Sequence, residues 1–198
     1  MPGSPPRDIS MNTFFICIDP GVNGAVAYGE LGDYKSIQVV DTPNFMLKKS
    51  GRKTARPVSN PKGMYDLLKK LSDGKDDVIV VMESVHARES DSKVSAFTFG
   101  ENYGIWKGII AATGLQNVSV TPQQWKRKVF GPSSPSGADD AKERSRQKCI
   151  ELLPHLSESL KYKKDHNRAE AALLCLYALR WLDLGKEHDS IASFEDGQ

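Results

Sequence analysis

The sequence predicts an α/β domain in which helices pack on the faces of a mixed β-sheet. Short apolar segments at residues 14–18 (FFICI), 24–28 (GAVAY) and 36–40 (SIQVV) come first, separated by turn residues, and indicate strands. Two more strand-like segments, 78–82 and 118–120, then alternate with segments of helical periodicity. Three strands followed by alternating strands and helices favour a mixed sheet with a helical layer on each face.

Caps and apolar periodicity mark the helical segments. Thr121, Pro122 and Gln124 match a capping box with proline in the first turn, so we expect a helix to start there. Residues 44–60 are basic and irregular, and 131–140 are rich in Pro, Ser and Gly, so both are expected to be loops. The remaining helices are predicted over residues 61–71, in the latter part of 95–112, and over 141–153 and 167–183.

Composition indicates an ordinary globular protein. With 198 residues, 39% hydrophobic and 26% charged, the chain is long enough for one domain with a substantial core. No apolar run approaches the ~20 residues that a membrane-spanning helix needs. Cys17, Cys149 and Cys175 lie far apart, which argues against a disulfide framework or a zinc site. A soluble protein of a reducing compartment, the cytoplasm or an organellar matrix, is therefore expected.

The two ends of the sequence differ from its middle. Residues 1–12 contain a Pro/Ser/Gly-rich start and no targeting signal, so they are interpreted as a disordered lead or a cloning remnant. Residues 185–198 are acidic and polar, which is typical of a flexible tail. One folded domain is therefore expected over residues 13–184.

The distribution of charge along the chain is more informative about possible ligands than the net charge of +2. Residues 48–70 hold eight lysines and arginines against one acid, and a second basic stretch covers 126–148. Such stretches suit a polyanion, although a solvated surface is the simpler interpretation of any charge run. The candidate DNA-binding basic residues are Lys48, Lys49, Arg52, Lys53, Arg56, Lys126, Lys128 and Lys142.

Four acids stand at the ends of predicted elements. Asp19 follows the first strand, Glu83 follows residues 78–82, and Asp165 and Glu170 lie at the start of the last helix. A carboxylate next to a buried strand costs free energy unless a cation meets it, and Mg²⁺ favours such oxygen ligands. Two simpler roles stay open: Asp19 as a turn aspartate before Pro-Gly, and Asp165 as a helix N-cap.

Six segments resemble, in order, the motifs of RuvC-type Holliday junction resolvases, from about residue 13 to 180. They are ICIDPGVNGAVAY, VIVVMESVHA, FGENYGIWKGIIAATG, TPQQWKRKVFG, DDAKERSRQKCIELLP and DHNRAEAALLCLYAL. Each match alone is weak, and the specificity lies in their order. The resemblance implies a ribonuclease-H-like fold and a metal-dependent endonuclease that cuts four-way DNA junctions as a homodimer. Its dimer face would be the apolar side of residues 103–112.

The last motif departs from the bacterial pattern, which has an acid three residues before the final one. This chain has Asn167 there, and its KKDHNRAEAALL instead resembles the chloroplast branch, with an Asp five residues before the Glu. The segment DTPNF also resembles that branch. By resemblance, two Mg²⁺ ions per site, replaceable by Mn²⁺, would be held by Asp19, Glu83, Asp165 and Glu170, with His166 as a helper.

The resemblance also implies contacts with DNA. Lys126 and Lys142 match lysines that meet the scissile or a neighbouring phosphate, with a solvated surface as the alternative. His86 stands where bacterial members have an aromatic residue that stacks at the opened junction. Phe97 and Phe99 are stronger candidates for base contact, with core packing as the alternative.

Other functions share parts of this pattern. An actin-like ATPase or sugar kinase also opens with a strand, an aspartate and a glycine turn, but needs a second phosphate-binding turn and more chain. A non-catalytic junction-binding module would be expected to lack some of the four acids. A related nuclease acting on other branched or RNA-containing DNA stays open.

Overall fold

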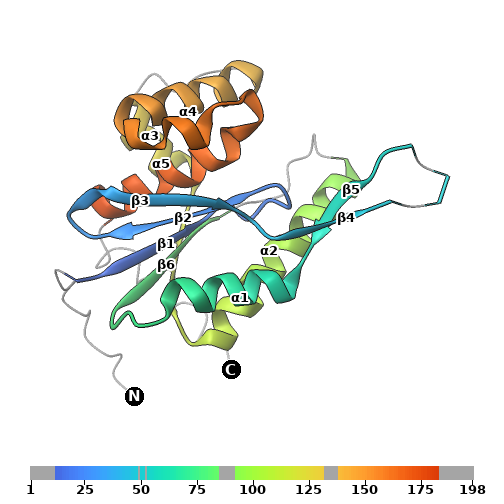
Figure 1. The fold of residues 1–198 in the computed structure, drawn as a ribbon, viewed down its shortest axis with the longest axis horizontal. Coiled ribbons are helices and arrows are strands. Elements are labelled where there is room, and N and C mark those ends of the chain that lie inside the picture. Colours follow the sequence, from blue (N-terminus) through green and yellow to red (C-terminus); the bar gives the residue numbers. More distant parts are fainter. Residues whose placement is uncertain (1–11, 49, 52, 85–91, 132–137, 183–198) are drawn as a thin grey trace.

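A five-stranded mixed sheet forms the centre of the computed structural model, which describes residues 12–48, 50–51, 53–84, 92–131 and 138–182. Its strands lie in the order β3-β2-β1-β6-β7, of which Figure 1 labels the first four. The central strand β1 pairs antiparallel with β2 and parallel with β6. This is the ribonuclease-H-like arrangement, and it confirms the predicted fold class. The strands are β1 (Phe14–Ile18), β2 (Ala25–Glu30), β3 (Asp33–Asp41), β6 (Val78–Glu83) and β7 (Gln116–Val120).

Helices cover both faces of the sheet (Figure 1). One face packs against α3 (Pro122–Phe130), α4 (Ala138–Leu152) and α5 (His166–Trp181), and the other against α1 (Pro61–Ser72) and α2 (Lys93–Thr113). Side chains of β1 alternate between these two cores, with Phe15 and Cys17 towards α5 and Ile16 and Ile18 towards α1 and α2. Burial on both faces explains why β1 and β6 are continuous apolar runs.

The predicted helix starts are confirmed in detail at α3. Thr121 Oγ1 accepts the backbone N–H of Gln124 (3.3 Å), and Gln124 Oε1 accepts the N–H of Thr121 (2.6 Å), which completes the capping box. None of the helices among the described residues has the length and apolar composition needed to cross a membrane.

The loop predicted over residues 44–60 is wrong. There β4 (Asn44–Leu47) and β5 (Arg56–Ser59) form a separate antiparallel hairpin. All residues of both strands are at least partly exposed, so no buried face left an apolar alternation in the sequence. The chain after α4 also contains two 3-10 helices that were not predicted, η1 (Pro154–Leu160) and η2 (Lys163–Asp165). The loop predicted at 131–140 is too long, because α4 begins at Ala138; residues 132–137 lie outside the described residues.

Candidate functional site

Asp19 and Glu83 lie side by side at the carboxyl ends of two parallel strands. The register pairs Ile18 of β1 with Met82 of β6, so the two acids occupy the next position on each chain. Ile18 and Met82 both point into the core beneath α1 and α2. Because side chains alternate along a strand, Asp19 and Glu83 are turned to the opposite face, which α3 and α5 cover.

Consecutive residues of α3 hold two glutamates of the site. The buried indole of Trp125 donates from Nε1 to Glu83 Oε1 (2.8 Å), and Lys126 Nζ donates to Glu170 Oε1 (3.2 Å). Ser145 of α4 donates its hydroxyl to the same Glu170 oxygen (3.0 Å). Neither Trp125 nor Ser145 was predicted from the sequence as a site residue. A tryptophan on a buried helix face could have signalled such a contact, because a buried indole N–H requires an acceptor.

The negative charges of this cluster are only partly compensated. Burial and the nearby charge of Glu83 raise the pKa of Asp19 from 3.8 to about 7, and Glu170 adds a smaller effect in the same direction. The Gly21 N–H, 3.1 Å from Asp19 Oδ1, and the charge of Lys126 act against this shift. A divalent cation would relieve the remaining repulsion.

The donor chemistry of the cluster fits such a cation. Asp19, Glu83 and Glu170 offer carboxylate oxygens, the ligands that Mg²⁺ favours. Among the described residues, however, no three acid, imidazole or thiol groups already stand in a metal-binding arrangement. Trp125 engages Oε1 of Glu83, and Lys126 and Ser145 engage Oε1 of Glu170, so a metal would have to share these oxygens, displace their partners or bind the second oxygen of each carboxylate.

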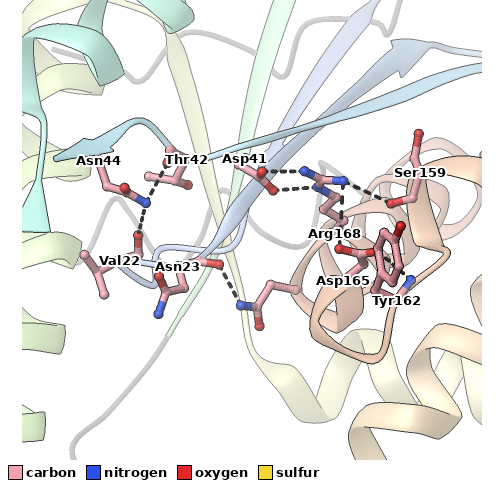
Figure 2. Close-up of polar contacts among 10 residues, drawn as sticks. Val22, Asn23, Asp41, Thr42, Asn44, Ser159, Tyr162, Asp165 and Arg168 are labelled. Carbon is pink, nitrogen blue, oxygen red and sulfur yellow. Dashed lines mark hydrogen bonds and ion pairs between the residues drawn. The ribbon is translucent and has the colours of Figure 1, made fainter. Parts of the chain in front are cut away.

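Asp165 has contacts of its own in a local turn. It is 7% exposed at the junction of η2 and α5, where its Oδ2 accepts the N–H of Tyr162 (2.8 Å) and its Oδ1 lies 3.9 Å from Arg168 Nη1 (Figure 2). His166 contacts the Lys163 carbonyl through Nδ1 (3.2 Å). The structure thus brings Asp19, Glu83 and Glu170 together and places Asp165 in a local turn.

Side-chain hydrogen bonds from α5 and from β4 hold the turn that follows Asp19 (Figure 2). Asn167 of α5 donates its side-chain amide to the Asn23 carbonyl (2.6 Å), and Asn44 of β4 donates to the Val22 carbonyl (3.3 Å). Gly24 closes the turn so tightly that a Cβ there would lie 2.1 Å from the Asp19 carbonyl oxygen. Glycine is therefore required at this position for steric reasons.

A polar cavity of about 350 Å³ adjoins this turn. Asn23 and Asn44 line one part of it, and residues 164–168 line another. Arg168 crosses the cavity region to Asp41, donating from both Nε and Nη2 to its carboxylate (Figure 2). This bidentate pair joins the first turn of α5 to the end of β3.

The candidate DNA contacts differ in how accessible they are. Among the basic residues, Lys126 is paired with Glu170, and the others that the structure describes, Lys48, Lys53, Arg56, Lys128 and Lys142, are exposed. Lys49, Arg52 and His86 lie outside the described residues. The side chain of Phe97 is 75% exposed, so the core-packing alternative is wrong for this residue, whereas Phe99 is half-buried.

Comparisons with known proteins agree with the fold. No protein-family model and no curated protein matches the sequence. Among solved structures, the yeast mitochondrial Holliday junction resolvase has a TM-score of 0.50 at 15% identity, covering 94% of this chain and 86% of its own. Thermus thermophilus RuvC (TM-score 0.48, 15% identity, 84% of this chain and 95% of that one) and the fowlpox virus Holliday junction resolvase (0.46, 15%, 85% and 99%) are also similar. At this identity the yeast structure shows a shared fold.

Asp19→Asn should raise the melting temperature of the protein in EDTA at pH 8. The change removes a poorly solvated negative charge beside Glu83, while the amide oxygen can still accept the Gly21 N–H. The folded pKa is about 7 and the unfolded value near 3.8, so the ionised group destabilises the fold progressively as pH rises through this range. Thermal unfolding should therefore show a smaller gain at pH 5.

The same melts test metal binding without relying on activity. Mg²⁺ should raise the melting temperature of the wild type more than that of Asp19→Asn, because the variant lacks one ligand charge. Identical melting temperatures for both proteins, with and without Mg²⁺, would contradict the acid cluster described above.

Proposed function

We propose that this chain is a metal-dependent endonuclease that resolves four-way DNA junctions, closest in motif pattern to the chloroplast branch of the RuvC-type resolvases. The main support for the proposal is structural. Asp19, Glu83 and Glu170 lie together with Lys126 at the carboxyl ends of β1 and β6. Further support comes from the ordered motifs and from a fold shared with the yeast mitochondrial resolvase.

Each residue of the cluster has a role in phosphodiester hydrolysis. Mg²⁺ bound by the acids, two ions by the family pattern, would supply an activated water and neutralise charge on the phosphate. Trp125 orients Glu83, and Ser145 orients Glu170. Lys126 brings positive charge to the place where phosphate oxygens become more negative during the reaction.

Two more residues join this site in the proposal. Lys142 lies three residues before Ser145 on α4, on the same side of the helix, so it can approach a phosphate near Glu170. Asp165 is proposed as the fourth ligand on motif spacing alone, and it would have to exchange its contact with the Tyr162 N–H for the metal. His166 is retained as a helper beside it.

Glu170→Gln and Asp165→Asn should each lower the rate of junction cleavage by roughly 100-fold or more, because each removes a metal-ligand charge. Stability should change little, since the new glutamine keeps an oxygen for the Ser145 hydroxyl and the new asparagine keeps one for the Tyr162 N–H. The measurement is single-turnover cleavage of a synthetic immobile four-way junction in Mg²⁺, with thermal melts of each variant.

Lys163→Ala, an exposed change in the same 3-10 turn, is the matched control and should cut normally. If Asp165→Asn also cuts normally, Asp165 serves only the local turn, because an asparagine oxygen can accept the Tyr162 N–H as well; its side chain makes no capping hydrogen bond to α5. Asn167→Ala is unsuitable as a control because its amide fastens the Asp19 turn. Cleavage of RNA-containing or other branched DNA in preference to the junction would redirect the substrate assignment.

We also propose a homodimer, because paired nicks on a two-fold symmetric junction need two active sites. The exposed side of α2 offers a surface of small residues at Gly100, Gly104 and Gly108. A Cβ added at any of these glycines would meet nothing within 4 Å, so a second helix could approach closely there. Trp106 and Ile110 of the same helix are buried against the sheet and belong to the monomer core.

Gly104→Leu should leave the monomer folded, since leucine favours a helix over glycine and has open space here, yet it should block close approach of a second α2. Light scattering after size exclusion should show a dimer for the wild type and a monomer for the variant. Lys69→Leu, an equally exposed change on α1, should remain dimeric. A dimeric Gly104→Leu would place the interface elsewhere.

A further inference from the structure

Two arginines lie close to Asp165, and each of them has another carboxylate as its main partner. Nη1 of Arg168 is 3.9 Å from Asp165 Oδ1, which is beyond the length of a hydrogen bond. Hydrogen bonds to Glu143 and to Asp41 are the largest cause of the raised pKa of Arg146 and Arg168, respectively, and the charge of Asp165 contributes less in the same direction. Asp165 therefore interacts with both guanidinium groups and is the closest partner of neither.

The main partners of the two arginines are the more exposed acids. Arg168 donates from Nε (2.6 Å) and Nη2 to Asp41, and Arg146 donates from Nε (3.1 Å) and Nη2 (2.6 Å) to Glu143. The side chains of Asp41 and Glu143 are 60% and 37% exposed, whereas that of Asp165 is 7% exposed. Because water screens exposed charges, charge alone would favour pairing of an arginine with the buried acid. Two parallel donors on one carboxylate keep each arginine with the exposed acid instead.

Arg168 has space to change partners. Asp41, Asp165 and Arg168 line the same polar cavity of about 350 Å³, and Figure 2 shows Arg168 between the two acids. Its Nη1 donates to the Ser159 carbonyl (3.2 Å), which keeps this end of the guanidinium beside Asp165. A charge-assisted N–H···O bond is roughly 2.8 Å long, so a shift of about 1 Å would bring Nη1 into contact with Asp165. The two hydrogen bonds to Asp41 oppose that shift.

We propose that Asp41 is a positioning residue for the metal site: it holds the guanidinium of Arg168 and thereby keeps the Asp165 carboxylate available to a divalent cation. An arginine bonded to Asp165 would compete with the cation, because both are attracted by the same negative charge. This inference rests on the proposed function, in which Asp165 is the fourth ligand. It gives a role to the first residue of the DTPNF segment, which the cluster of Asp19 does not use.

The test is a double-mutant cycle of Asp41→Asn and Arg168→Gln, measured by metal binding in the absence of DNA. Electron paramagnetic resonance gives the concentration of free Mn²⁺, and thermal melts give the stabilisation by Mg²⁺. Asp41→Asn alone should weaken Mn²⁺ binding by at least about 5-fold, because Arg168 then pairs with Asp165. In the presence of Arg168→Gln the same change should have little effect, since no guanidinium remains to be held.

The single variant Arg168→Gln should bind Mn²⁺ at least as tightly as wild type. Melts without metal show whether each variant is folded. Arg168→Met, which keeps an unbranched apolar stem without the charge, takes the place of Arg168→Gln in the cycle if that variant does not fold.

Glu30→Gln is the matched control. It removes a carboxylate that is 55% exposed and that pairs with Lys75 (3.0 Å), so it breaks an exposed ion pair and changes the net charge by the same amount as Asp41→Asn. Glu30 ends β2, whereas the turn of Asp19 precedes this strand. This variant should bind Mn²⁺ as wild type does.

The outcomes separate this inference from the proposed function. If wild type binds Mn²⁺ and cuts junctions but Asp41→Asn binds Mn²⁺ equally well, the inference fails and the nuclease stands. An equal loss with and without Arg168→Gln would show that Asp41 acts through its own charge alone, which also overturns the inference. The same holds if Asp41→Asn still weakens binding in an Asp165→Asn background. A wild type that neither binds Mn²⁺ nor cuts junctions in Mg²⁺ would remove the proposed function itself.

Discussion

The parallel pairing of β1 with β6 is the constraint on which the rest of the site depends. It places Asp19 and Glu83 at the same edge of the sheet and on the same face, although 64 positions separate them in the sequence. Two carboxylates this close repel each other, and burial increases the effect, so the pKa of Asp19 rises to about 7. The folded sheet therefore contains an unfavourable repulsion between these carboxylates. The positive charge of Lys126 relieves it in part, and a divalent cation would relieve it more fully.

The helices determine how that charge is presented. Trp125 and Lys126 are neighbours on α3, yet one engages Glu83 and the other Glu170, so this single helix orients acids from β6 and α5. Asn44 and Asn167 hold the turn of Asp19 from β4 and α5. The cluster is thus built from elements far apart in the chain, and each acid has a partner that limits its rotation. Such contacts limit the motion of the acids before any ligand binds.

The proposed function can draw on exposed basic and apolar side chains near the acids. The β4–β5 hairpin carries basic residues and exposed apolar side chains, and its first residue, Asn44, contacts the turn that bears Asp19. Phe97, another exposed aromatic residue, lies in the first turns of α2, which follows Glu83 in the chain. Both segments leave the sheet from the edge where the acids meet. The exposed glycines of α2 form a separate surface, the one to which the proposed dimer contact is assigned.

The sequence by itself determined the elements whose signals are local. Continuous apolar runs defined β1 and β6, the capping residues defined α3, and the resemblance of the motifs to those of the resolvases implied that Asp19 and Glu83 would meet. Only the tertiary structure decided the rest. The β4–β5 hairpin buries no face and so left no periodic pattern, and the contacts of Trp125, Ser145 and Asn167 join residues at least 25 positions apart. Spacing placed Asp165 and Glu170 in one motif, but the helix turns them to different partners because five residues do not complete a whole number of turns.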